Sequence, residues 1–210
     1  MMAEEREEPG DRGRSRFDVV AVFVLSITAV LTAWCGFEAS KWGGEMSIAF
    51  SQASSARVQA VAAEGEARDA RQYDLTIWAQ WVLAEHEGDT ELVTFIEQRF
   101  SPEFRIAFDA WNEGGRTAQG PFAMPEYVPP GTVEAKELSR TADERFDAAL
   151  VNNQRGDDYT LLTVLFALVL FLTAMSQRDI APWVRRALLG LAVVVGLAGV
   201  AIMLTFPIKI

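Results

Sequence analysis

Three uncharged apolar stretches constrain what this 210-residue chain can fold into: residues 19–36, 159–175 and 187–207. Each is close to the roughly 17 to 25 residues that a helix needs to cross a bilayer core about 30 Å thick. A helix satisfies its own backbone hydrogen bonds, as a segment in lipid must. We therefore predict an all-α membrane protein with transmembrane helices at residues 17–36, 159–175 and 187–207.

The first apolar stretch has a second interpretation, a cleaved signal peptide, because it follows a basic segment. The bulky Trp34 directly before Cys35 fits neither a small-residue cleavage site nor a lipid-modified cysteine, so we expect a retained anchor. Cys35 is the single cysteine of the chain. A lone thiol forms no internal disulfide, so the expected role of Cys35 is packing, with an intermolecular disulfide as the alternative.

Basic residues near the ends of the spans predict the orientation. The first span is preceded by Arg6, Arg12, Arg14 and Arg16, and the segment between the second and third spans contains Arg178, Arg185 and Arg186. We expect residues 1–16 to form a flexible cytoplasmic tail and residues 176–186 a cytoplasmic turn. Residues 37–158 and the C-terminal residues 208–210 are then extracytoplasmic.

The segment 37–158 carries the acidic excess of the chain, with 11 Lys or Arg against 22 Asp or Glu. Phosphate binding requires clustered positive charge. This segment is therefore not expected to bind nucleic acid.

Helical patterns dominate the extracytoplasmic segment. No proline occurs between Phe17 and Glu87, so the first transmembrane helix is expected to continue beyond the membrane, with Gly43, Gly44 and Gly65 as its weak points. Apolar residues, nearly all of them alanine, then recur at alternating steps of four and three, which predicts close packing against another helix. These positions are Trp42, Met46, Ala49, Ala53, Ala56, Ala60, Ala63, Ala67 and Ala70. The alternative is a solvated alanine-rich helix with coincidental spacing.

Stop and start signals divide the rest of this segment. Gly88 and Asp89 predict the end of one helix and the start of the next, and Ser101-Pro102 predicts a further start. The Pro-rich residues 116–131 predict an extended loop anchored on the helices by its apolar side chains, or else a disordered one. A last helix from Thr132 leads into the second span. Its expected inward face consists of Ala135, Leu138, Ala142, Phe146, Ala149, Asn153 and Gly156. The segment is thus predicted to be a helical hairpin or bundle continuous with the first two spans.

No residue pattern indicates chemistry. His86 is the only histidine, and its neighbours Glu85 and Glu87 point about 100° away from it on a helix, so they cannot converge on one metal ion. No nucleophile or phosphate-binding motif is present. The three spans contain no ionisable group of the kind that transporters use. We expect no catalytic residue, cofactor or metal, and hence no enzyme.

Small residues form stripes on two of the spans. Ser26, Ala29, Ala33 and Gly36 share one helical face, and Ala192, Gly196 and Gly199 share another. Such faces bring transmembrane helices together. Combined with the alanine pattern beyond Trp42, they predict a homo-oligomer.

Aromatic and basic side chains indicate contact with the bilayer and a packed core. Trp34, Lys41 and Trp42 are expected at the membrane interface. The tryptophans of the extracytoplasmic segment, Trp42, Trp78, Trp81 and Trp111, could form a ligand pocket, but core packing is the expected role.

Two segments carry a resemblance to a known group of proteins. Residues 33–45 read AWCGFEASKWGGE and residues 121–127 read PFAMPEY, ahead of paired C-terminal spans. In these features the chain resembles a group of bacterial three-span membrane proteins that has no assigned reaction or ligand. The resemblance covers most of the chain after the tail and implies the bacterial plasma membrane.

Because every readable feature concerns packing, we expect a non-enzymatic assembly or scaffold protein that forms a homo-oligomer. The alternative is an extracytoplasmic helical-bundle sensor that works through a separate membrane or extracytoplasmic partner. A third hypothesis is an oligomeric pore in which Ser26, Thr28 and Thr32 line the axis.

Overall fold

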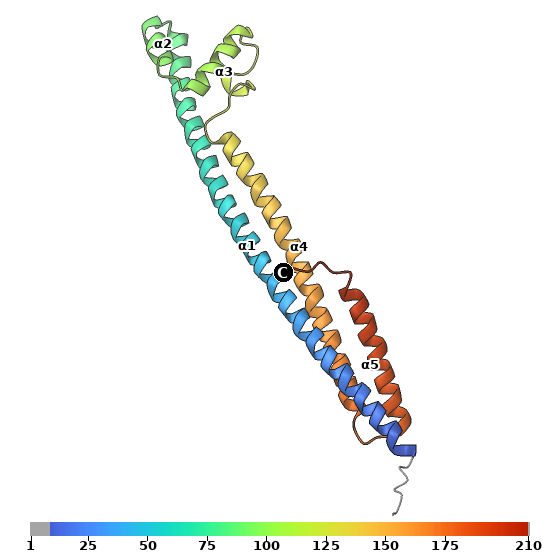
Figure 1. Cartoon of the computed structure of the whole chain (residues 1–210). Coiled ribbons are helices and arrows are strands. Elements are labelled where there is room, and N and C mark those ends of the chain that lie inside the picture. The colour runs from blue at the N-terminus through green and yellow to red at the C-terminus, as the bar shows by residue number, and fades with distance from the viewer. Residues whose placement is uncertain (1–8, 210) are drawn as a thin grey trace, which may run out of the picture. The chain divides into compact units, whose positions relative to one another are not determined.

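The structure, a computed structural model, describes residues 9–209 and the side chains of residues 17–209, and all its regular elements within that range are helical (Figure 1). The predicted all-α class is confirmed. The elements are α1 (Pro9–Glu87), α2 (Thr90–Glu97), α3 (Pro102–Glu113), the 3-10 turn η1 (Pro121–Ala123), α4 (Thr132–Ser176) and α5 (Pro182–Met203).

Three of these helices are long and apolar enough to cross a membrane: α1 within Phe17–Glu87, α4 and α5. Residues 9–16, expected to be a flexible tail, already belong to α1, while residues 1–8 lie outside the described residues. Helix α5 begins at Pro182, where proline suits the first helical turn, and ends at Met203. Residues 204–207 of the expected third span therefore follow the helix.

The chain divides into two compact units. The first, here called the span unit, contains residues 9–48 and 148–209 of the described chain. The second, here called the head unit, contains residues 49–147. Helices α1 and α4 contribute to both units.

In the span unit, α1 packs with α4 and α5 through one face. Cys35 and Trp42 on α1 form a core with Tyr159, Leu162 and Phe166 of α4. Helix α5 lies beside α4 in Figure 1 and buries Leu189, Ala192 and Gly199. The apolar contacts between these three helices hold the unit together.

In the head unit, α1 and α4 pack closely along faces of alanine. The buried positions are Ala49, Ala53, Ala56, Ala60 and Ala63 on α1, and Ala135 and Ala142 on α4. Where the loop passes into α4, the backbone lies close to α1, because a Cβ atom added to Gly131 would lie 2.3 Å from the Ala63 carbonyl oxygen. The buried alanines of α1 and of α4 lie in this region of the head unit.

Helices α2 and α3 form an aromatic core with the last turns of α1. The buried residues of this cluster are Trp81, Ala84, Ile96, Phe100, Phe104, Phe108 and Trp111. Both predicted caps are present, since the side chains of Asp89 and Ser101 accept hydrogen bonds from the backbone N–H groups of Leu92 and Phe104. The Pro-rich loop packs on this core through Phe122, Met124 and Tyr127.

Candidate functional site

The inner face of α1 repeats every seven residues along the whole helix. Its members are Ala21, Thr28, Cys35, Trp42, Ala49, Ala56 and Ala63, each at most 7% exposed. A strict seven-residue repeat keeps one face of a helix turned toward its partners. The inner face is therefore the side of α1 that packs against other residues of the chain.

The predicted small-residue stripe, Ser26, Ala29, Ala33 and Gly36, is exposed in the described chain. It therefore lies away from the helices that α1 contacts. A Cβ atom built on Gly36, Gly43 or Gly44 would meet nothing within 4 Å. The backbone of α1 is open to close approach along this stripe.

The small residues predicted on α5, in contrast to those on α1, pack against other residues of the same chain. A Cβ atom on Gly199 would lie 2.9 Å from Phe166 Cε1, and one on Gly196 would lie 3.6 Å from Val169 Cγ1. Ala192 is fully buried. These residues serve the contact between α4 and α5.

The five alanines proposed for oligomer packing, Ala49, Ala53, Ala56, Ala60 and Ala63, are likewise buried within the head unit. Their spacing is explained by the pairing of α1 with α4. They therefore provide no evidence for a second copy of the chain.

The three residues expected at the membrane interface separate into two groups. Trp34 is 37% exposed, and the exposed Lys41 has its Nζ 6.0 Å from the centroid of the Phe37 ring. Trp42, in contrast, is 4% exposed and belongs to the core of the span unit. The Trp42 ring therefore packs against the helices of the span unit, on the inner face of α1, and does not point outward.

A buried carboxylate lies on the same side of α1. Glu38 is completely buried, and its Oε2 accepts a hydrogen bond of 2.9 Å from the backbone N–H of Lys209. The hydroxyl of Tyr159, which is 1% exposed, donates to the Pro207 carbonyl at 3.1 Å. These two bonds hold the segment after α5 against α1 and α4.

Glu38 escaped the sequence analysis because it lies two residues beyond the predicted end of the first span. The sequence signal for its burial is the heptad pattern beyond Trp42, because the same pattern also continues toward the N-terminus. Extended backward, it places Cys35 inward, and Glu38 lies between Cys35 and Trp42 at steps of three and four. A carboxylate on this face is predicted to be buried.

The head unit contains a second buried carboxylate, Asp74, which is 1% exposed. The hydroxyl of Tyr127 donates to Asp74 Oδ2 at 2.8 Å. Burial, and then the hydrogen bond to the Asp74 carboxylate, raise the pKa of Tyr127 above its ordinary value. The pair ties the Pro-rich loop to α1.

The tryptophans of the head unit are core residues. Trp78 stacks on Trp81 with ring centroids 4.9 Å apart. The indole N–H of Trp81 donates to Glu97 Oε1, and that of Trp111 donates to the Ala118 carbonyl, both at 2.9 Å. The indole N–H groups of Trp81 and Trp111 are thus hydrogen-bonded within the chain, as core packing requires.

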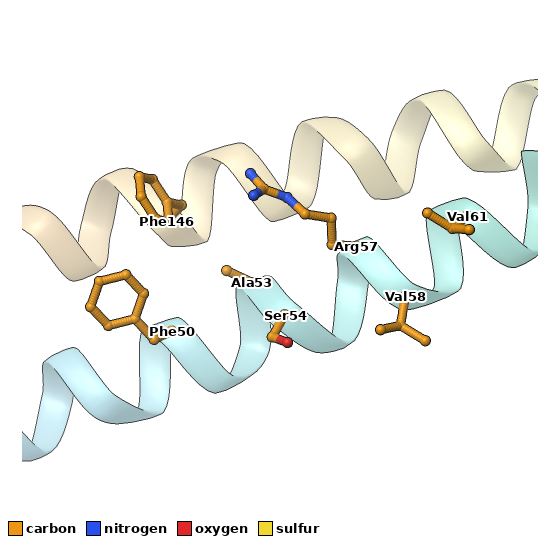
Figure 2. Close-up of a pocket in the computed structure, with 7 residues that line it drawn as sticks. All are labelled: Phe50, Ala53, Ser54, Arg57, Val58, Val61 and Phe146. Atoms are coloured by element: carbon orange, nitrogen blue, oxygen red, sulfur yellow. The ribbon is translucent and has the colours of Figure 1, made fainter.

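An open groove with a volume of about 470 Å³ lies on the surface of the head unit, and Figure 2 shows the residues that line it. Its walls are mainly apolar and come from α1 and α4. The lining residues are Phe50, Ala53, Ser54, Arg57, Val58, Val61 and Phe146. Arg57 is bound to Asp143 at 3.1 Å and lies over the Phe146 ring, so its charge is already paired.

Comparison of the chain with protein-family models, with curated proteins and with solved structures gives no match.

Proposed function

We propose that this chain is a non-enzymatic assembly or scaffold protein of the bacterial plasma membrane that forms a homo-oligomer through the small-residue stripe of α1. In this proposal the N-terminus is cytoplasmic and the head unit extracytoplasmic. The supporting observation is that Ser26, Ala29, Ala33 and Gly36 are exposed, while a different face of α1 makes the contacts within the chain. Small side chains let two transmembrane helices approach closely.

The residues beside the stripe support the choice of a second copy over lipid as the occupant of this face. Bulky residues suited to lipid, among them Phe23, Ile27 and Val30, lie along the adjacent strip and are also exposed. A helix surrounded by lipid alone needs no row of short side chains next to such a strip. The stripe extends past the predicted span to Ser40, Gly44 and Ser47, all exposed.

The test is a mass measurement in mild detergent and in lipid nanodiscs over a range of protein concentrations. Gly36→Leu adds a side chain into open space within the monomer, so we expect it to leave the fold intact and weaken the oligomer by at least tenfold. Val30→Leu on the bulky strip is the matched control and should have little effect. A wild-type chain that remains monomeric at every concentration in both media would refute the proposal.

The pore hypothesis has less support. Thr28 is buried among the helices of its own chain, at 4% exposed. The hydroxyls of Ser26 and Thr32 donate to the carbonyls of Val22 and Thr28 one turn earlier in the same helix. Planar-bilayer recordings provide the test, since single-channel currents that change with Ser26→Ala would favour a pore over a packed assembly.

The groove of Figure 2 is the observation that favours the sensor alternative. Its apolar walls suit a ligand with an apolar body, and an acidic group on that ligand would replace Asp143 as the partner of Arg57, since this ion pair is exposed at the surface. A rise in the melting temperature of the full chain with medium-chain fatty acids, lost in Arg57→Gln, would support this function. No shift with any chain length would argue against it.

A further inference from the structure

Two buried polar atoms of the span unit have no hydrogen-bond partner among the residues that the structure describes: Glu38 Oε1 and Trp42 Nε1. Both residues lie on the inward side of α1, one helical turn apart, and are 0% and 4% exposed. Side chains separated by four residues are neighbours on a helix, with Cβ atoms about 5–6 Å apart. Buried polar groups in native proteins are nearly always paired.

The needs of the two atoms are complementary. An indole N–H can only donate a hydrogen bond, and a carboxylate oxygen can only accept one. A hydroxyl group between the two atoms meets both needs, because its oxygen accepts from the indole N–H and its proton is donated to the carboxylate oxygen.

The surrounding charges indicate that this third group is neutral. Arg155 lies 4.6 Å from the Trp42 ring centroid, and Lys209 Nζ lies 5.5 Å from it and 3.4 Å from Glu45 Oε1. Two cations close to the indole disfavour a metal or ammonium ion at the indole N–H. The other titratable groups of this core, Cys35 and Tyr159, carry no positive charge.

We infer that Glu38 and Trp42 form a buried binding site for a single hydroxyl group, which accepts from Trp42 Nε1–H and donates to Glu38 Oε1. Such a bridge pairs two buried groups that make no direct hydrogen bond with each other in the structure. Water is the smallest molecule with this chemistry, and the hydroxyl of a phosphatidylglycerol headgroup is the membrane source of the same group. With the site filled, hydrogen bonds connect the backbone of Lys209 through Glu38 to Trp42.

The experiment follows the indole N–H resonances of the full chain, labelled with ¹⁵N-tryptophan, in nanodiscs with and without phosphatidylglycerol. Loss of one resonance in Trp42→Phe assigns Trp42. We expect a cross-peak between Trp42 Nε1–H and the proton of a bound hydroxyl, and a changed shift in Glu38→Gln. Trp81 is the internal control, since this indole is also buried but donates to Glu97 Oε1, and it should show no such cross-peak.

A cross-peak to water in both lipid compositions supports the site with water as its ligand. A cross-peak that appears only with phosphatidylglycerol, at the headgroup frequency, supports it with the lipid hydroxyl. A Trp42 resonance that behaves like that of Trp81 overturns the inference. Should Trp42→Phe or Glu38→Gln fail to fold, a map of the wild-type chain that resolves ordered waters decides the question, because density within hydrogen-bond distance of both atoms is required.

Discussion

At the residue scale, Gly131 has the most restrictive surroundings in the head unit. Its φ is +80°, in the left-handed region that side chains other than glycine rarely adopt, and a Cβ atom would lie 2.3 Å from the Ala63 carbonyl oxygen. The carbonyl belongs to helix backbone, which cannot move aside as a side chain can. Glycine is therefore required where the Pro-rich loop passes into α4.

Gly131→Ala should lower the free energy of unfolding by at least about 2 kcal/mol, from backbone strain and overpacking together. The matched control is Gly65→Ala, in the regular part of α1, where a Cβ atom would meet only the Arg68 side chain at 3.7 Å. Alanine favours a helix over glycine, so this control should be neutral or stabilising. Thermal unfolding of both variants in detergent measures the difference, and equal midpoints would contradict the role given to Gly131.

The Tyr127–Asp74 pair predicts a pH dependence. Burial and the bond to Asp74 raise the pKa of Tyr127, so the folded state keeps the phenolic proton at pH values where the unfolded state releases it. The resulting stabilisation is complete below the unfolded pKa of about 10 and is lost as the pH rises through the higher folded pKa. Wild type should therefore lose stability above pH 10 more steeply than Tyr127→Phe.

The same substitution has a cost at neutral pH. Tyr127→Phe removes the one donor to Asp74 Oδ2 found among the described residues, and an unsatisfied buried group costs about 1–3 kcal/mol. Denaturant unfolding at a series of pH values measures both effects. All other residues are the same in the two proteins, so the difference between the two curves isolates Tyr127. Curves that coincide across the whole range would show that the hydrogen bond does not contribute.

At the element scale, local signals predicted most helix ends, because caps act through the residues beside them. Gly88, with φ +77°, and Asp89 separate α1 from α2, and Ser101 begins α3 as expected. The sequence alone did not show which faces meet inside the chain. Small-residue stripes on α1 and α5 have the same pattern, yet that of α5 is buried and that of α1 is exposed. The difference depends on the three-dimensional arrangement of the helices.

Helix α5 gives a test of that arrangement. Gly199→Ala should force Phe166 and Leu165 to move and cost about 1–3 kcal/mol, because a Cβ atom would lie 2.9 and 3.1 Å from their side chains. Gly196→Ala is the matched control, with ordinary contact at 3.6 Å. A lower melting temperature for Gly199→Ala alone, without a change in oligomer mass, is expected. A variant that keeps its stability but loses oligomer mass would instead place Gly199 between copies.

At the scale of the whole molecule, two sets of contacts define the ends of the span unit. Arg185 binds Asp18 at 3.3 Å, donates to the Ser176 carbonyl and lies over the Phe17 ring. The start of the α1 span and the turn between α4 and α5 are therefore at one end. Glu38 and Trp42, farther along α1, contact the segment after α5, so these residues mark the other end of the span unit.

These contacts bear on the topology prediction. Because Arg185 contacts Asp18 and Phe17 at the start of the first span, we expect the segment before that span and the α4–α5 turn on the same side of the membrane. Clustered arginines favour the cytoplasm. In a Cys35→Ser background, a cysteine at Asp89 in the head unit should react with an impermeant thiol reagent in intact bacterial cells. A cysteine at Asp179 in the turn should react only after permeabilisation. Both positions are exposed, so failure to react reports the membrane barrier rather than burial. Labelling of Asp179→Cys but not Asp89→Cys in intact cells would invert the topology, and labelling of both would show that α4 does not cross the bilayer.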